Sequence, residues 1–106
     1  LYQKYNNDRA IALSERAFRL SPDKPEIADT YGWILVNFGQ YDKGLNLLRE
    51  AFAKMPENPE VAYHVGYALN KAGKNEEAKK VLARIIRDHK NSPYAAEAKE
   101  LEATIN

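Results

Sequence analysis

The chain has 106 residues, of which 44% are hydrophobic and 29% charged, a composition that fits one globular domain. Its 16 basic and 15 acidic residues are spread along the whole length and leave a net charge of +1, so no strong field favours nucleic acid as a partner. The lack of cysteine excludes disulfides, thiolate metal sites and cysteine nucleophiles, and no apolar run approaches the roughly 20 residues of a membrane span.

The sequence repeats itself with a period of 34 residues. A shift by that interval lays Pro25-Glu26 on Pro59-Glu60, Gly32 on Gly66 and Gly39 on Gly73. Seven of the 34 positions are identical between residues 25–58 and residues 59–92. A period of this length predicts stacked structural repeats.

Residues 1–24 fit the last part of a preceding repeat. We expect the tail of a first helix, a turn at Tyr5 to Asn7 and then a second helix. The side chains expected to face inward on that second helix are Ala10, Leu13, Ala17 and Phe18. Because most of the first helix would lie outside this stretch, part of the apolar stripe should be uncovered.

Residues 25–58 predict two helices joined by a tight turn. The first runs from about Glu26 to Phe38, and Gly39 ends it as a left-handed cap, where a side chain would be penalised. The second begins near Asp42 and stops before Pro56. Its apolar stripe consists of Leu45, Leu48, Ala51 and Phe52.

Residues 59–92 predict the same unit again. Asn58 suits the N-cap of the first helix, Pro59 suits its first position, and Gly73 closes it. A second helix is expected from Glu76 to Arg87. Its inward side chains would be Ala78, Leu82, Ile85 and Ile86.

Residues 93–106 predict one further helix, opened by Pro93. One stripe of this helix consists of Tyr94, Ala98, Leu101 and Ile105, and its water-facing side of Glu97, Lys99, Glu100 and Glu102. Such a helix would cap the end of a repeat array with a polar face.

Gly32 and Gly66 stand in the body of the expected helices, where glycine costs roughly 0.5–1 kcal/mol relative to alanine. The cost is explained if two antiparallel helices press together at these points, because a larger residue would force the backbones apart at roughly 1–3 kcal/mol. Ala10, Gly44 and Ala78 would be the small residues on the partner helices.

These features resemble the tetratricopeptide repeat, a 34-residue helix-turn-helix with the pattern W-x2-L-G-x2-Y, then A-x3-F, then P. The pattern falls on Ala28, Tyr31, Gly32, Leu35, Gly44, Leu48, Ala51 and Pro56 in one unit, and on Ala62, Val65, Gly66, Leu69, Ala78, Leu82 and Ile85 in the next. The resemblance implies an all-α, right-handed superhelical array of antiparallel helix pairs in one domain. It would comprise a partial repeat (1–24), two repeats (25–58 and 59–92) and a capping helix (93–106).

A narrower resemblance rests on two phrases. The run D-T-x-G-W-I-L-V at 29–36, followed by P-E-x-x-Y-H at 59–64, is similar to the C-terminal repeats of bacterial lipoproteins associated with PEP-CTERM protein sorting and exopolysaccharide systems. This resemblance implies a periplasmic array tethered to a membrane, with a cytoplasmic location as the alternative.

The concave side of such arrays is their usual ligand face, and the first helix of each pair lines it. The residues expected there, as a peptide-binding row, are Asp29, Trp33, Val36, Asn37, Tyr63, Tyr67, Asn70 and Lys71. Tyr2 and Gln3 would extend the row on one side, and Tyr94, Glu97 and Leu101 on the other.

Trp33 and Tyr67 occupy equivalent places in the two repeats. Large aromatic side chains at these places either contact a bound peptide or pack between the repeats, and both interpretations stay open. In similar proteins that clamp the carboxylate tail of a chaperone, an asparagine stands at this place. The difference implies an apolar or aromatic peptide instead.

The sequence offers little to a catalytic or metal-binding interpretation. His64 and His89 fall on different helices and are expected at the surface or along the groove, and Asp29 and Glu26 have the first-turn positions that acidic residues favour. We therefore expect no cofactor, no metal and no enzymatic activity.

The function that follows is a non-catalytic protein-interaction scaffold that binds a peptide or a partner helix on the concave face. The alternatives are a structural spacer within a longer array and self-association, with a homodimer formed through the uncovered N-terminal helix.

Overall fold

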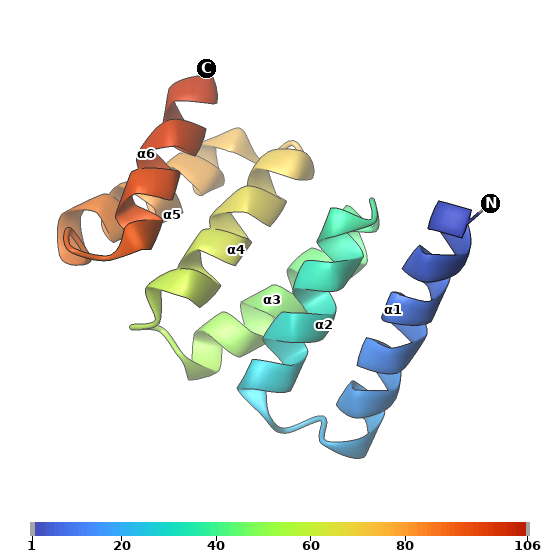
Figure 1. The fold of residues 1–106 in the computed structure, drawn as a ribbon. Helices are drawn as coiled ribbons and strands as arrows, with labels where there is room; N and C mark the ends of the chain where they lie inside the picture. The colour runs from blue at the N-terminus through green and yellow to red at the C-terminus, as the bar shows by residue number, and fades with distance from the viewer. Residues whose placement is uncertain (1, 106) are drawn as a thin grey trace.

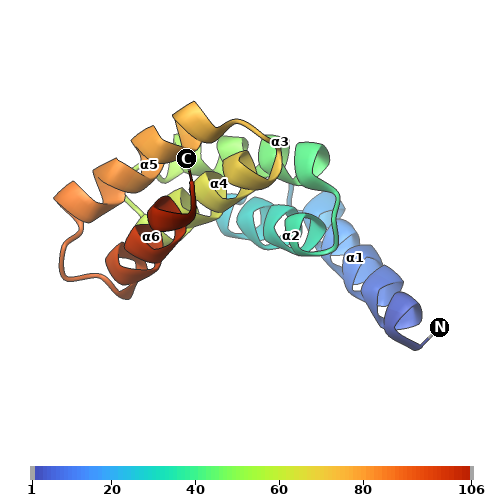
Figure 2. The same ribbon diagram turned by 90° about the horizontal axis from the view of Figure 1, so that it is seen from above.

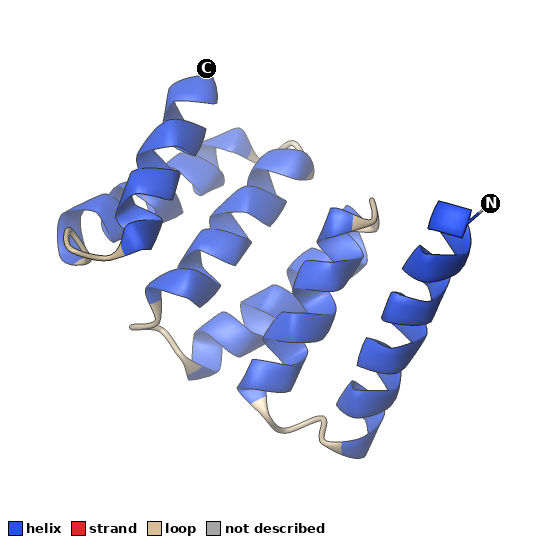
Figure 3. Cartoon of the chain, in the orientation of Figure 1, coloured by secondary structure: helices blue, strands red, loops and turns tan. Residues whose placement is uncertain are grey.

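The computed structural model describes residues 2–105 of the chain and the side chains of residues 6–105. All regular secondary structure in this part of the chain is helical (Figure 3). The helices, labelled in Figure 1, are α1 (Tyr2–Leu20), α2 (Pro25–Asn37), α3 (Tyr41–Lys54), α4 (Pro59–Lys71), α5 (Asn75–Asp88) and α6 (Pro93–Thr104).

The helices stack as consecutive pairs. Helix α2 packs against α3, α4 packs against α5, and α6 contacts both α4 and α5, while α1 lies beside α2 at the other end of the array (Figure 1). Seen from above, α2, α4 and α6 form one layer and α3 and α5 another, and the array bends with α2, α4 and α6 on the inner side (Figure 2). We call α2, α4 and α6 the inner layer. The predicted all-α array of helix pairs is confirmed.

Glycine and capping side chains end and begin the helices where the sequence predicts. Gly39 and Gly73 both have a left-handed backbone, with φ of 92° and 82°. The side chain of Asn58 accepts hydrogen bonds from the backbone N–H groups of Glu60 at 2.9 Å and Val61 at 3.2 Å, which confirms its role as the N-cap of α4.

The expected turn at Tyr5 to Asn7 is wrong, because α1 runs without interruption from Tyr2 to Leu20. The period of 34 places Tyr5 where Gly39 and Gly73 stand in the later turns. A tyrosine adopts a left-handed backbone only at a cost, so the helix continues through this position instead of ending there.

The close approach expected at the body glycines is confirmed. A Cβ atom at Gly44 would lie 2.6 Å from the carbonyl oxygen of Gly32 and 2.6 Å from Cγ2 of Val36. A Cβ atom at Gly32 would lie 2.9 Å from the carbonyl oxygen of Gly44, and one at Gly66 would lie 2.8 Å from a methyl group of Leu82. Helices α2 and α3 therefore meet backbone to backbone.

One core runs through successive helix pairs. Leu48 of α3, Leu69 of α4 and Leu82 of α5 are fully buried within a single apolar cluster, which Ala98 of α6 and Ile105 extend to the end of the described chain. Because the same cluster includes side chains from five helices, α2 to α6, each pair is stabilised by the pair beside it.

Helix α1 departs from the expected inward stripe. Ile11 and Phe18 pack against a cluster made by Tyr31, Leu35 and Leu47, whereas Leu13 is 58% exposed and Ala17 is exposed. The sequence predicts an uncovered part of this helix, because the positions equivalent to Leu13 lie against the first helix of their own pair in the later repeats.

The contact between α2 and α3 predicts a specific weakness at Gly44. Gly44→Ala should lower the free energy of unfolding by roughly 1–3 kcal/mol, because the added methyl group meets the Gly32 backbone. Urea denaturation followed by circular dichroism measures the change. Asn46→Ala, at an exposed position of the same helix, is the matched control, and equal stability of the two variants would contradict this account of the contact.

Candidate functional site

Four aromatic side chains form a continuous row across the inner layer. Trp33 of α2 lies 5.1 Å from Tyr67 and 6.5 Å from Tyr63 of α4, measured between ring centroids, and Tyr63 lies 6.0 Å from Tyr94 of α6. All four side chains are half-buried. We call Trp33, Tyr63, Tyr67 and Tyr94 the aromatic row.

The period of the sequence explains why these residues meet. Trp33 and Tyr67 occupy the same position of successive repeats, so stacking the repeats places them side by side. Glu60 and Tyr94 are also 34 residues apart, and the Tyr94 hydroxyl donates to Oε2 of Glu60 at 2.7 Å. Each aromatic residue therefore contacts a neighbouring repeat as well as its own.

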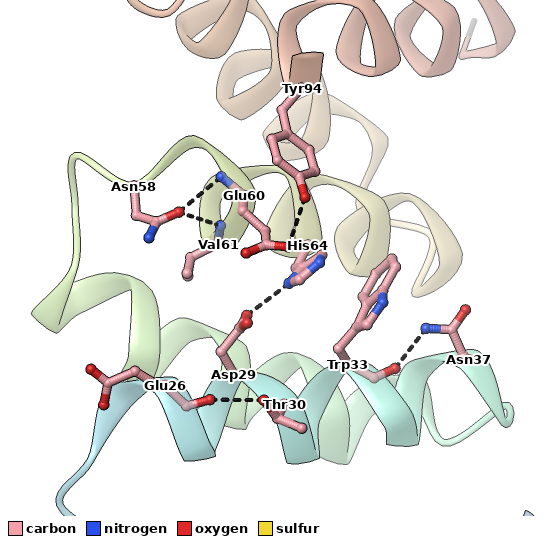
Figure 4. A network of polar contacts seen from close by, with 10 residues as sticks. All are labelled: Glu26, Asp29, Thr30, Trp33, Asn37, Asn58, Glu60, Val61, His64 and Tyr94. Atoms are coloured by element: carbon pink, nitrogen blue, oxygen red, sulfur yellow. Dashed lines mark hydrogen bonds and ion pairs between the residues drawn. The ribbon is translucent and has the colours of Figure 1, made fainter. Parts of the chain in front are cut away.

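Beneath Trp33 lies a buried polar pair, drawn in Figure 4. Nδ1 of His64 lies 2.8 Å from Oδ1 of Asp29, and the His64 ring stacks on the indole of Trp33 with centroids 4.0 Å apart. His64 is 6% and Asp29 9% exposed. The pair joins α4 to α2 and holds the Trp33 ring in place.

This pair corrects two expectations. His64 was expected at the surface or along the groove, and Asp29 among the peptide-contacting residues, but both side chains are buried against each other. The reason is stacking, since a separation of 35 residues places them on facing helices of adjacent repeats. Sequence reasoning missed this pair, although the same period that matches Trp33 with Tyr67 could have found it.

The question of whether Trp33 and Tyr67 face a groove or pack between repeats has a mixed answer. Both rings pack against the shared core, and both keep part of their surface exposed. Such a side chain stabilises the stack and also presents part of its surface to solvent.

The other residues predicted to contact a peptide differ in how much of their surface is exposed. Val36 is 1% exposed and packs where α2 meets Gly44, so the expectation that it lines the open face is wrong. Asn37 is exposed, and its amide donates to the Trp33 carbonyl oxygen at 2.8 Å. Asn70 is half-buried, and its amide donates to Asn75 at 3.1 Å.

Lys71 lies over one end of the aromatic row. Its Nζ atom is 5.3 Å from the centroid of the Tyr67 ring, within the range of a cation–π contact. At the other end of the row, Glu97 is exposed and Leu101 is half-buried. The suggested extension through Tyr2 and Gln3 falls on side chains outside the described part of the structure.

Carboxylates influence the tyrosines of the row. The hydrogen bond to Glu60, together with burial, raises the pKa of Tyr94 to about 12. Burial and the nearby charge of Glu97 raise the pKa of Tyr63. Both hydroxyls therefore stay neutral around pH 7.

The arrangement provides aromatic area and hydrogen-bonding groups on a rigid support. Among the described residues, no group of three histidine, aspartate or glutamate side chains could hold a metal ion, and every buried side-chain polar atom has a hydrogen-bond partner. Within the same part of the chain, no helix is both long and apolar enough to cross a bilayer.

The Asp29 and His64 pair predicts energetic coupling between α2 and α4. Asp29→Ala and His64→Ala should each lower the free energy of unfolding by about 1–3 kcal/mol, because each leaves a buried polar group unpaired. The double variant should lose less than the sum, and Asp29→Asn, which keeps a hydrogen-bonding side chain, should lose less than Asp29→Ala. Urea denaturation measures all four, and strictly additive losses would show that the two side chains act independently.

The fold of this chain is similar to that of solved structures of another protein. No functionally curated protein matches the sequence. Among solved structures, the chain is similar to MamA AMB-1 in two crystal forms, one with a TM-score of 0.70 at 26% identity and the other with 0.66 at 23% identity. These alignments cover 91% and 93% of this chain but only 59% and 66% of the MamA chains, so this chain spans less than two thirds of their length.

The sequence pattern of the tetratricopeptide repeat matches residues 35–101, from within α2 to within α6. This range covers more than half of the chain and includes all of α3, α4 and α5, with the end of α2 and most of α6. Its repeat fold is typically a scaffold for protein interaction and not a catalytic centre. The chain belongs to the tetratricopeptide repeat family.

Proposed function

We propose that this chain is a non-catalytic scaffold that holds an extended peptide or a partner helix on its inner layer, over the aromatic row. The observation that carries the proposal is the continuity of the row across α2, α4 and α6, with part of each ring exposed. Large aromatic side chains contribute much of the binding energy at protein interfaces.

The row is organised before any partner arrives. Trp33 rests on His64, which Asp29 holds, and the Tyr94 hydroxyl is bonded to Glu60 (Figure 4). Rings that are already fixed lose little conformational freedom on binding, so more of the contact energy appears as affinity.

The proposed contact surface is smaller than the set expected from sequence. It keeps Trp33, Asn37, Tyr63, Tyr67, Asn70 and Lys71 and adds Tyr94. Asp29 acts from below by positioning His64, and Val36 belongs to the core. We propose that this surface is carried by the units 25–58, 59–92 and 93–106, with 1–24 as a partial repeat beside them.

The setting we propose is a longer array, since the chain spans less than two thirds of the MamA chains. The similarity of residues 29–36 and 59–64 to envelope lipoprotein repeats supports a periplasmic, membrane-tethered location.

Selection from a random peptide library tests the proposed surface. Peptides enriched on the chain should bind the variant Tyr63→Ala/Tyr67→Ala at least about tenfold more weakly, because two of its anchors are removed. Tyr41→Ala, at an exposed tyrosine of α3, is the matched control and should bind normally. Fluorescence anisotropy measures the affinities, and circular dichroism checks that each variant is folded. Selection of no peptide, or equal weakening by Tyr41→Ala, would contradict the proposal.

A second candidate function is self-association through α1. Leu13 is 58% and Leu20 75% exposed on this helix, and Ala17 is exposed between them. In the later repeats, the equivalents of Leu13 are Leu47, which is buried, and Val81, which is half-buried. We propose that a second copy of the chain covers this face.

Sedimentation velocity tests self-association directly. Wild-type chain should form a dimer whose fraction rises with concentration, and Leu13→Glu/Leu20→Glu should be monomeric, because charges cannot be buried at the apolar contact. Ala83→Glu/Ala96→Glu, at exposed positions of α5 and α6, is the control with the same added charge. A wild-type chain that stays monomeric across the concentration range would end this second candidate.

A further inference from the structure

We propose that the inner layer selects a cationic peptide, with lysine or arginine side chains seated on the aromatic row between Glu60 and Glu97. This inference rests on the proposed peptide-binding function and specifies the chemistry of the ligand. It is independent of the overall net charge, which is close to zero.

Acidic and basic residues are mixed along the sequence, but the folded chain distributes them unequally between the inner layer and the other helices. The three helices of the inner layer contain six acidic residues, Glu26, Asp29, Glu60, Glu97, Glu100 and Glu102, against two lysines, Lys71 and Lys99. Helices α1, α3 and α5 contain 11 basic residues against seven acidic ones. The net charge of +1 therefore combines an excess of acidic residues on α2, α4 and α6 with an excess of basic residues on α1, α3 and α5.

Two of the inner carboxylates lie next to the aromatic row. Glu60 is exposed and held by the Tyr94 hydroxyl at 2.7 Å, and Glu97 is exposed on α6, one helical turn from Tyr94. Asp29 is already paired with His64 beneath the row. A carboxylate beside an aromatic face is a favourable setting for an ammonium or guanidinium group, since both attract positive charge.

The row already accepts one cation. Nζ of Lys71 lies 5.3 Å from the centroid of Tyr67, so an ammonium group occupies the face of a ring in the unbound chain. Within the described part of the chain, no lysine or arginine lies over the ring of Trp33 or Tyr63. A ligand cation would find at Trp33 the kind of ring that binds cations best.

The charges of nearby carboxylates contribute to the raised pKa values of two tyrosines of the row. The pKa of Tyr94 rises to about 12, first through its hydrogen bond to Glu60, and the pKa of Tyr63 rises through burial and then through the charge of Glu97. The charge of Glu97 is one of the smaller causes of both pKa shifts, and the same carboxylate would attract a cation. The same carboxylates would repel an acidic peptide. A ligand that binds through its own carboxylate groups is therefore disfavoured.

Three matched peptides test the charge preference. The first is acetyl-Ala-Arg-Leu-Ala-Arg-Leu-Ala amide, the second replaces both arginines by citrulline, which is neutral and nearly the same shape, and the third replaces them by glutamate. The arginine peptide should bind roughly tenfold more tightly than the citrulline peptide, and the difference should shrink as salt screens the charges. The glutamate peptide should bind most weakly. Fluorescence of Trp33, the single tryptophan, reports binding.

Charge-neutralising variants locate the source of the preference. Glu60→Gln/Glu97→Gln should reduce the advantage of arginine over citrulline to about twofold or less, because the carboxylates beside the row are gone. Glu50→Gln/Glu76→Gln, at exposed positions of α3 and α5, removes the same charge and should keep the advantage. Equal loss in both variants would show a general charge effect and overturn the inference.

A measurement without any peptide tests the potential itself. Relative to a free tryptophan amide, caesium ions should quench Trp33 more efficiently than iodide, because a negative potential concentrates cations at the ring. The difference should fall in Glu60→Gln/Glu97→Gln and persist in Glu50→Gln/Glu76→Gln, with acrylamide quenching as the neutral control for access. Iodide quenching equal to that of caesium would overturn the inference.

The outcomes separate this inference from the function on which it rests. If all three peptides bind equally well and binding is lost in Tyr63→Ala/Tyr67→Ala, the row is a peptide site without charge preference, and only the cationic ligand is wrong. If none of the peptides binds and the random library yields no binder, both proposals fail.

Discussion

The contact between two backbones at Gly32 and Gly44 is the constraint on which the rest of this structure depends. Because a Cβ atom at either position would lie within 3 Å of the opposite carbonyl oxygen, α2 and α3 approach more closely than side chains would permit. Leu48, Leu69 and Leu82 are buried in one apolar cluster that runs through this pair and the next. Stability is therefore gained through neighbours, as expected for a chain of stacked repeats.

The same stacking positions the aromatic row. Residues about 34 positions apart lie side by side on adjacent helices, which brings Trp33 to Tyr67, Asp29 to His64 and Glu60 to Tyr94. Each aromatic side chain packs against the shared core and keeps part of its surface exposed to solvent. A residue with both roles links binding to stability, so weakening the support under Trp33 would change both the fold and the inner surface.

Much of the fold could be predicted from local signals. Gly39 and Gly73 mark left-handed caps, Asn58 marks a helix start, and the body glycines mark the close contacts, because each of these depends on backbone geometry within a few residues. The three expectations that the structure contradicts have a common cause. The turn expected near Tyr5, the exposure of Val36 and the open position of Asp29 all depended on which neighbour a residue would meet after folding.

The sequence by itself determined the repeat length, the helix pairs and the family, because backbone preferences and a regular apolar pattern are written in the order of residues. Only the tertiary structure decided which polar side chains are buried as partners and how the charges are distributed in space. Acidic and basic residues are mixed along the chain and nearly cancel in sum. Folding places α2, α4 and α6, which contain more acidic than basic residues, in one layer (Figure 2), whereas most of the basic residues belong to the other helices.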